Sequence, residues 1–372
     1  MEERLTPKST YQKWMEEQGI PIIKAPAVED VTQVARKLWP YLGAPAAFID
    51  LDGMEGWTGM YVVEIPPGGA LNPEKHLYDE ILYIIKGSGF TEIGLKGKTQ
   101  TFEWKERSLF SPPLNVWHRL VNGTNEPVIV LGITGAPIIM DLFYNMDFIF
   151  HNDFVFKDRY QEQEDYFTGE GKRSQVGMGT LWETNFVPDV MKVLLDPFER
   201  KAEQLRLTFL HMSNSSASGH IAEWPSGIYH KAHYHAGGIV LLSLQSKGYW
   251  LLWPSDAGTK PYQNGREDEV LKVNFTPGTV GSPATAWYHA RYNTGLEPAR
   301  QLALTMAGSR LHSVTARRAI NKRDEGSFIS TREGGTLIEY EDEDPEIRKR
   351  FEEDCRQGGV TSQMPPLIYR TD

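Results

Sequence analysis

The chain contains a single cysteine, Cys355, among its 372 residues, which excludes an internal disulfide bond and favours a reducing compartment. The chain also lacks a net positive charge: 49 acidic residues outnumber 39 basic ones, and the resulting net charge of −10 argues against binding to the phosphate backbone of nucleic acids. No stretch approaches the roughly 18 consecutive apolar residues of a membrane helix, and the first residues lack the apolar core of a signal peptide. We therefore predict a cytoplasmic protein with no nucleic-acid or membrane partner.

Several common catalytic motifs are absent as well. No phosphate-binding glycine loop precedes an expected helix, and there is no Gly-x-Ser-x-Gly turn of the kind that carries a nucleophilic serine. The remaining composition, with 40% hydrophobic and 24% charged residues, is that of an ordinary globular protein long enough for two or three domains. The chemistry must therefore come from other residues.

The most informative pattern is an internal repeat of two separated blocks. In one block a Ser-Pro pair, a tryptophan, a histidine, an asparagine and a Glu-Pro pair follow one another with identical spacing in both halves, and the matching histidines are His118 and His289. The other block aligns residues 68–76 with residues 227–235. The blocks lie further apart in the second half, and we assign the excess to an enlarged hairpin loop at residues 255–269. A duplicated domain is the simplest explanation.

Short apolar segments between these blocks are typical of β-strands. They are bounded by Gly, Pro, Asn and Asp, which is the pattern of an antiparallel sandwich or barrel. The segments comprise residues 60–65, 81–85, 128–131, 238–242 and 249–252. Helices are expected near the ends, at residues 11–18 and 28–38 and after Asp344, an N-cap that precedes Pro345. The predicted fold class is all-β, with flanking N-terminal and C-terminal helices.

Three histidines in the second half form a candidate metal site. Successive side chains of a strand point to opposite faces, so His233 and His235 should share one face. His289, from the other block, supplies a third imidazole. Neutral imidazole is a common ligand of zinc, copper, iron and nickel, and three such ligands leave coordination positions open. We therefore predict that His233, His235 and His289 bind a catalytic metal ion.

Both halves resemble the two sequence motifs of the cupin superfamily. The first motif contains a glycine, a His-x-His pair, a glutamate and a turn glycine, and the second contains a proline turn, a histidine and an asparagine. The resemblance covers roughly residues 55–135 and 215–310 and implies two tandem jelly-roll (cupin) barrels, a bicupin. The implied domains are an N-terminal helical extension at 1–50, a first cupin barrel at 51–160, a second at 161–325, and a C-terminal extension with a helix at 326–372.

The resemblance also implies ligand positions in both barrels. In the first half these positions are held by Glu74, His76, Glu80 and His118, with Glu74 where the family has a histidine. This mixed set makes a second possible metal site suited to manganese or iron, and a degenerate barrel that binds no metal is the alternative. In the second half Ile239 stands at the glutamate position, so three neutral ligands remain. This three-histidine site resembles that of the gentisate, salicylate and diketone dioxygenases of the cupin superfamily.

Three further residues are candidates for catalysis in the second half. Arg291 shares the strand face of His289, and its planar guanidinium suits a substrate carboxylate, although an ion pair with a barrel-rim acid is the alternative. The first half has Leu120 at the equivalent position. His230 should face away from His233 and could take part in acid–base chemistry, act as a fourth ligand or form a hydrogen bond at the barrel mouth. Tyr229 should provide a hydroxyl close to the metal ligands.

These patterns together favour a non-haem iron(II) dioxygenase that cleaves a small carboxylate, aromatic or enolic among the options, which chelates the metal. The partners would be this anionic substrate and molecular oxygen. A redox-neutral hydrolase, isomerase or decarboxylase that uses manganese, zinc or nickel is the first alternative, and a non-catalytic small-molecule-binding bicupin is the second. By resemblance, a homo-oligomer is expected.

Overall fold

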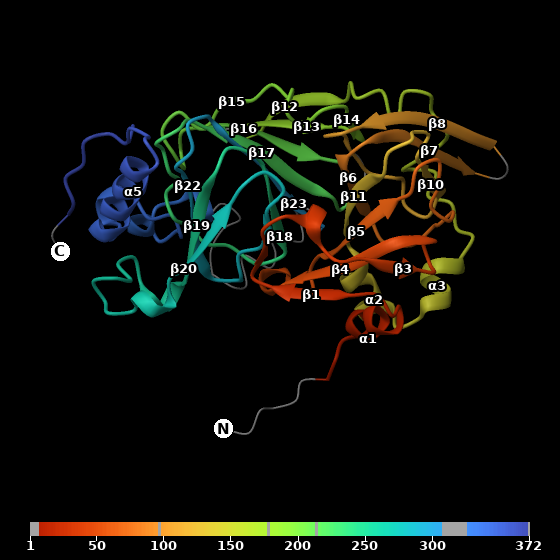
Figure 1. Cartoon of the computed structure of the whole chain (residues 1–372), viewed down its shortest axis with the longest axis horizontal. Coiled ribbons are helices and arrows are strands. Elements are labelled where there is room, and N and C mark those ends of the chain that lie inside the picture. Colours follow the sequence, from red (N-terminus) through yellow and green to blue (C-terminus); the bar gives the residue numbers. More distant parts are fainter. Residues whose placement is uncertain (1–6, 96–97, 177–178, 213–214, 307–325, 371–372) are drawn as a thin grey trace.

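The computed structural model describes residues 7–95, 98–176, 179–212, 215–306 and 326–370. Two β-barrels lie next to each other, with the helices at the periphery (Figure 1). In each barrel a large sheet packs against a three-stranded antiparallel sheet through buried apolar side chains. The all-β prediction with terminal helices is therefore confirmed. No helix within the described ranges is both long enough and apolar enough to cross a membrane.

The first barrel is built from strands that begin earlier in the chain than expected. Its large sheet has the order β1-β4-β5-β11-β6-β9-β14, with β3 beside β4, and its small sheet has the order β10-β7-β8. The strands are β1 (Ile22–Ala25), β3 (Lys37–Trp39), β4 (Ala44–Leu51), β5 (Gly59–Ile65), β6 (Glu80–Lys86), β7 (Ser88–Leu95), β8 (Lys98–Lys105), β9 (Leu109–Phe110), β10 (Trp117–Val121) and β11 (Val128–Thr134).

The second barrel repeats this arrangement. Its large sheet has the order β12-β13-β16-β17-β23-β18-β21-β2, with β15 beside β16, and its small sheet has the order β20-β19-β22. The strands are β12 (Lys172–Val176), β13 (Gly179–Glu183), β15 (Asp196–Pro197), β16 (Arg206–His211), β17 (Ser218–Trp224), β18 (Ile239–Gln245), β19 (Gly248–Pro254), β20 (Leu271–Phe275), β21 (Val280–Gly281), β22 (Trp287–Asn293) and β23 (Ala299–Thr305).

The two barrels exchange short strands and share a core. β2 (Ala27–Val28) follows β1 but pairs with β21 of the second barrel, and β14 (Phe186–Val187) pairs with β9 of the first. One cluster of buried apolar side chains includes Val62 and Leu131 of the first barrel together with Ile221 and Leu302 of the second. This continuous core fixes the two barrels against each other.

Helices occur near both ends and after the first barrel. They are α1 (Thr10–Glu17), α2 (Ala136–Phe143), α3 (Met146–His151) and α5 (Pro345–Gln357). Short 3₁₀ turns are η1 (Val31–Gln33), η2 (Asp52–Met54), η3 (Ser255–Ala257), η4 (Glu267–Glu269), η5 (Gly326–Phe328), η6 (Thr331–Glu333) and η7 (Tyr340–Asp342). As predicted, the Asp344 side chain caps α5 by accepting a hydrogen bond from the Glu346 amide. The enlarged loop at 255–269 also lies between β19 and β20, as expected.

One helix prediction is wrong. Residues 28–38 form the end of β2, the turn η1 and part of β3 instead of a helix. Val31 and Val34, which gave this segment its helical spacing, are both buried, but they reach the core from a turn that Asp30 caps. Pairing of β2 with β21 and of β3 with β4 outweighs the local preference. The segment expected to be a helical extension therefore contributes strands to both barrels.

Candidate metal centres

The first barrel brings Glu74, His76, Glu80 and His118 together. One ligand atom from each lies within 4.8 Å of the others, and all four side chains are buried. Glu80 is the first residue of β6 and His118 lies on β10. Glu74 forms an isolated antiparallel bridge with His118, which fixes the preceding loop against the barrel wall. Two separate segments, residues 74–80 and the strand that carries His118, thus converge inside the barrel.

Backbone carbonyls orient the two imidazoles of this first centre. Nδ1 of His76 donates to the carbonyl of Tyr78 at 2.7 Å, and Nδ1 of His118 donates to the carbonyl of Val116 at 2.9 Å. Because a carbonyl only accepts, each Nδ1 carries the proton and each Nε2 has a free lone pair. Both Nε2 atoms and Oε2 of Glu80 are buried without a hydrogen-bond partner. Three unsatisfied acceptors in one place fit a bound cation.

The spacing and charge of the first centre also fit a divalent cation. Oε2 of Glu80 lies 3.6 Å from Nε2 of His76 and 3.7 Å from Nε2 of His118. These separations are too long for hydrogen bonds and only slightly wider than ligand spacings around an ion with bonds of about 2.1 Å. Burial raises the pKa of Glu80, but the nearby imidazoles of His118 and His76 outweigh burial and lower the pKa to about 2. Burial and the nearby Glu80 raise the pKa of Glu74.

Two tyrosines support the first centre. The hydroxyl of Tyr61, on β5, donates to Oε1 of Glu80 at 2.7 Å and leaves Oε2 directed at the centre. The ring of Tyr78 stacks on His76 with centroids 3.7 Å apart. Sequence reasoning did not identify Tyr61, because one tyrosine in an apolar strand has no motif to mark it. Together with the backbone carbonyls, these contacts hold both an imidazole and a carboxylate in fixed orientations.

The second barrel brings together the three predicted histidines, His233, His235 and His289. One nitrogen from each lies within 4.8 Å of the others. His233 bridges to His289 on β22, which repeats the Glu74–His118 bridge of the first barrel. Each Nδ1 donates to a nearby backbone carbonyl at 2.7 to 3.3 Å, so each Nε2 carries the lone pair. Burial, with the charges of Arg291 and Lys201, lowers the pKa of His289 to about 3, which keeps this imidazole neutral at pH 7.

A lysine that sequence reasoning missed reaches this second centre. Nζ of Lys201, in the loop between β15 and β16, lies 2.9 Å from Nε2 of His233. Burial and the charges of Arg291 and Arg200 hold the pKa of Lys201 well below its usual range. The lysine interacts with the same lone pair that a metal ion would use. A metal bound here would therefore replace this contact, which the flexible lysine side chain permits.

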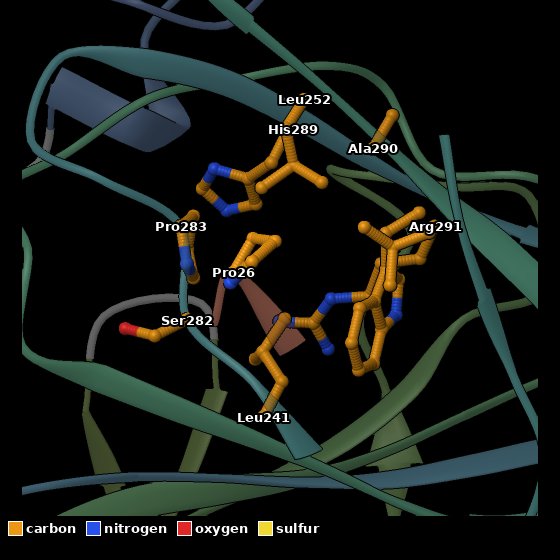
Figure 2. Close-up of a pocket in the computed structure, with 10 residues that line it drawn as sticks. Pro26, Leu241, Leu252, Ser282, Pro283, His289, Ala290 and Arg291 are labelled. Atoms are coloured by element: carbon orange, nitrogen blue, oxygen red, sulfur yellow. The ribbon is translucent and has the colours of Figure 1, made fainter. Parts of the chain in front are cut away.

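A buried arginine, Arg291, flanks the histidines of the second centre. Figure 2 shows His289 and Arg291 beside a cavity of about 10 Å³, whose wall includes Pro26, Trp250 and Ser282. Nε and Nη1 of Arg291 are buried without a hydrogen-bond partner, and burial lowers the pKa of Arg291 to about 10. The guanidinium remains charged at pH 7. No ion pair with a rim carboxylate, the alternative considered for this residue, is seen within the described ranges.

The prediction for His230 is wrong about its direction. Strict alternation would turn it away from His233. However, Tyr229 pairs with Tyr292 and His233 pairs with His289, so four residue steps in this segment lie opposite only three on β22. This extra residue is a bulge, and it breaks the alternation. His230 is buried with Nε2 unpartnered, and its pKa is held well below the usual range by burial and then by the charges of Arg291 and Lys201. His230 therefore belongs to the barrel interior beside Arg291.

Tyr229 does not provide the hydroxyl expected next to the metal ligands. Its hydroxyl donates to Glu343, and its ring stacks on Tyr292 with centroids 4.8 Å apart. Tyr292 lies three residues from His289 on β22, so it faces the opposite side of the sheet. Tyr229 thus packs outside the histidine cluster, against α5 and the segment that leads into it.

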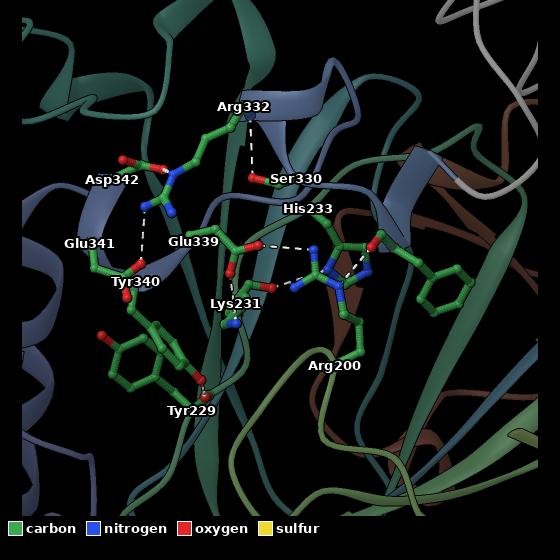
Figure 3. Close-up of polar contacts among 11 residues, drawn as sticks. Arg200, Tyr229, Lys231, His233, Ser330, Arg332, Glu339, Tyr340, Glu341 and Asp342 are labelled. Carbon is green, nitrogen blue, oxygen red and sulfur yellow. Dashed lines mark hydrogen bonds and ion pairs between the residues drawn. The ribbon is translucent and has the colours of Figure 1, made fainter. Parts of the chain in front are cut away.

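Glu339 lies near the second centre but is already paired. Figure 3 shows its carboxylate between Arg200 and Lys231, at 2.9 and 2.7 Å. Burial raises its pKa, but hydrogen bonds from these two cations outweigh burial and lower it. Because both of its oxygens are engaged, Glu339 does not neutralise Arg291.

Comparison with known proteins gives a family match within the first barrel. Residues 61–134, which run from β5 to β11, match the family described as the cupin domain. Structures of oxalate decarboxylase variants from Bacillus subtilis are similar to the chain: one shares 15% sequence identity with a TM-score of 0.48 and another 14% with 0.48, and each comparison covers 76% of this chain and 78% of that chain. A third, with 15% identity, a TM-score of 0.48 and the same coverage, concerns the Mn(II) centres of that enzyme. A search of curated proteins found no match.

The second barrel repeats the cupin fold of the first, so the chain has a bicupin architecture. Glu80 lies opposite Thr134 in the β6–β11 pair, and Ile239 lies opposite Thr305 in the β18–β23 pair. Gly68 and Gly227, which open the repeated block, both have positive φ, a conformation that favours glycine. Ile239 therefore occupies the place of Glu80, and the second centre lacks that carboxylate.

Proposed function

We propose that the protein is a metal-dependent bicupin enzyme, an iron(II) dioxygenase that acts on a small carboxylate at the His233, His235 and His289 centre. One observation carries the proposal: three imidazoles with carbonyl-bound Nδ1 atoms converge where the other barrel uses two carboxylates. Neutral ligands leave the charge of a divalent ion undiminished and leave coordination positions open.

Bound iron(II) would supply a centre at which oxygen and a chelating substrate meet. The chain's own residues would bind and orient that substrate. Arg291 presents two unpartnered N–H groups next to His289, and its planar fork matches a carboxylate. Trp250 and Leu252 on β19 line the same cavity and limit access of water. The protein would thus contribute fixed metal ligands, an arginine that binds the substrate carboxylate, and apolar side chains that limit access of water.

Matched variants of the two barrels test this proposal. His289→Ala and His118→Ala remove equivalent histidines from β22 and β10, and elemental analysis together with oxygen uptake would be measured for both. We expect iron in the purified protein, loss of one metal equivalent in each variant, and loss of oxygen uptake only in His289→Ala. Retention of all metal in His289→Ala, or uptake that depends on His118 alone, would contradict the proposal.

A redox-neutral lyase, isomerase or hydrolase centred on the first barrel is a second candidate. The observation that favours it is the pair of buried carboxylates, of which Glu74 has a raised pKa suited to proton transfer. Manganese would suit this mixed oxygen and nitrogen set. Activity that survives without oxygen and is lost in His118→Ala would support this candidate over the dioxygenase.

A further inference from the structure

Matching backbone hydrogen bonds define which residues of the two barrels are equivalent. In the first barrel the Leu71 amide donates to the Leu120 carbonyl at 2.9 Å, and in the second the His230 amide donates to the Arg291 carbonyl at 3.0 Å. The residues that follow bond in the same way, with Asn72 donating to the Leu42 carbonyl and Lys231 donating to the Lys201 carbonyl. Three interior positions of the first barrel thus correspond to three of the second.

At these three positions the first barrel has leucines, whereas the second barrel has basic residues. Leu42, Leu71 and Leu120 are buried in the first core. Their equivalents are Lys201, His230 and Arg291. The first barrel shows that the fold itself requires no polar group at these positions. Buried donors are costly unless they have a partner, so three such replacements in one interior indicate a ligand.

The missing partner is negatively charged. The side chains of Arg291 and His230 are buried and retain unpartnered nitrogens. Within the described part of the chain, no carboxylate forms an ion pair with Arg291 or Lys201, and the nearby Glu339 is already paired with Arg200 and Lys231. A divalent ion on the histidines would add further positive charge. The second barrel therefore needs anionic groups from its ligand.

The cavity limits the size of that anion. Its volume of about 10 Å³ beside Arg291 is close to the space for one water molecule. Trp250 occupies much of the space that Gly281 leaves open: a Cβ on Gly281 would lie 2.3 Å from the indole. A space of this size beside Arg291 excludes an aromatic ring, so the anion must be small.

We infer that Lys201, His230 and Arg291 form an anion site that receives the carboxylate of a short aliphatic acid. The inference rests on the proposed function, because it names the class of substrate that the three-histidine centre would act on. Arg291 donates from its fork, and Lys201 and His230 donate from the adjacent walls. Arg291 lies two residues from His289 on β22 and Lys201 contacts His233, so an acid of a few carbons held here has its other end beside the histidines.

Thermal unfolding of the full-length protein tests the site directly. Sodium formate or acetate would replace sodium chloride at constant ionic strength. The test variants are Lys201→Leu, His230→Leu and Arg291→Leu, which restore the residue that the first barrel tolerates. Lys192→Leu is the matched control, because it removes an exposed lysine elsewhere. We expect wild type and Lys192→Leu to gain about 3–5 °C at saturating formate, and the three test variants to lose most of that gain.

Several outcomes would overturn the inference. They are a gain in formate no larger than in chloride, a full gain in the three leucine variants, or an equal gain with benzoate, which is too large for the cavity. Metal content and oxygen uptake, measured on the same samples, separate this inference from the proposed function. If formate raises the unfolding temperature of the wild type but not of the leucine variants, and the protein shows neither iron nor oxygen uptake, only the dioxygenase is refuted. If oxygen uptake is present but formate does not raise the unfolding temperature, only the anion site is refuted.

Discussion

Replacement of Arg291 by leucine should make the ligand-free protein more stable. Two of its guanidinium nitrogens are buried without partners, and each unsatisfied donor costs about 1–3 kcal/mol. A buried leucine contributes about 2 kcal/mol of apolar stabilisation, and Leu120 shows that the position accepts one. The space left by the shorter side chain offsets part of this gain. We expect a net increase of about 2 kcal/mol in the free energy of unfolding.

Arg300→Leu provides a matched control with the opposite sign. Arg300 is as buried as Arg291, but its guanidinium donates to Glu223 at 2.9 Å and to the Val193 carbonyl at 2.7 Å. Its removal leaves those acceptors unpaired and should cost about 2–3 kcal/mol. Both free energies come from urea unfolding in chloride buffer without small carboxylates. If Arg291→Leu were as destabilising as Arg300→Leu, Arg291 would have a structural partner and the reasoning would be refuted.

Three further predictions concern other parts of the molecule. Tyr61→Phe removes the hydrogen bond to Glu80 and should weaken metal binding at the first centre by about 10–100-fold in a chelator competition, and an unchanged affinity would contradict this. Burial raises the pKa of Glu343 to about 8, so the folded protein keeps a proton that the unfolded chain releases. Stability should therefore fall as pH rises from 5 to 8, by about 1 kcal/mol per pH unit relative to Glu343→Gln, and parallel urea-unfolding curves would argue against it. Asp344→Ala removes the cap of α5 and an acceptor for the Gln263 amide. It should lower the free energy of unfolding by about 1 kcal/mol and speed hydrogen exchange at the Gln263 amide. Unchanged exchange at Gln263 would contradict a stabilising role for this hydrogen bond.

Short-range spacing in the sequence was sufficient to predict several turns, one helix cap and the candidate metal ligands. The paired histidines, the repeated turn glycines and the Asp344-Pro345 cap each have a local pattern with one physical meaning. The same patterns led to the two sets of metal-ligating candidates, and the structure brings each set together. The helix expected at residues 28–38 failed because pairing with two different sheets, which no local pattern encodes, outweighed helical spacing.

Only the tertiary structure determined what surrounds the histidines. A one-residue bulge, invisible in the spacing, turns His230 into the barrel and separates Tyr229 from it. Lys201 reaches His233 from a loop 32 residues earlier in the chain, so nothing in the histidine motif points to it. The repeated blocks predict a duplicated barrel, and the residues at the matching positions predict two unlike ligand sets, because both inferences need only residue order and the alternation of a strand. The cluster of Lys201, His230 and Arg291 depends on contacts between distant segments, which become neighbours only when the barrel closes.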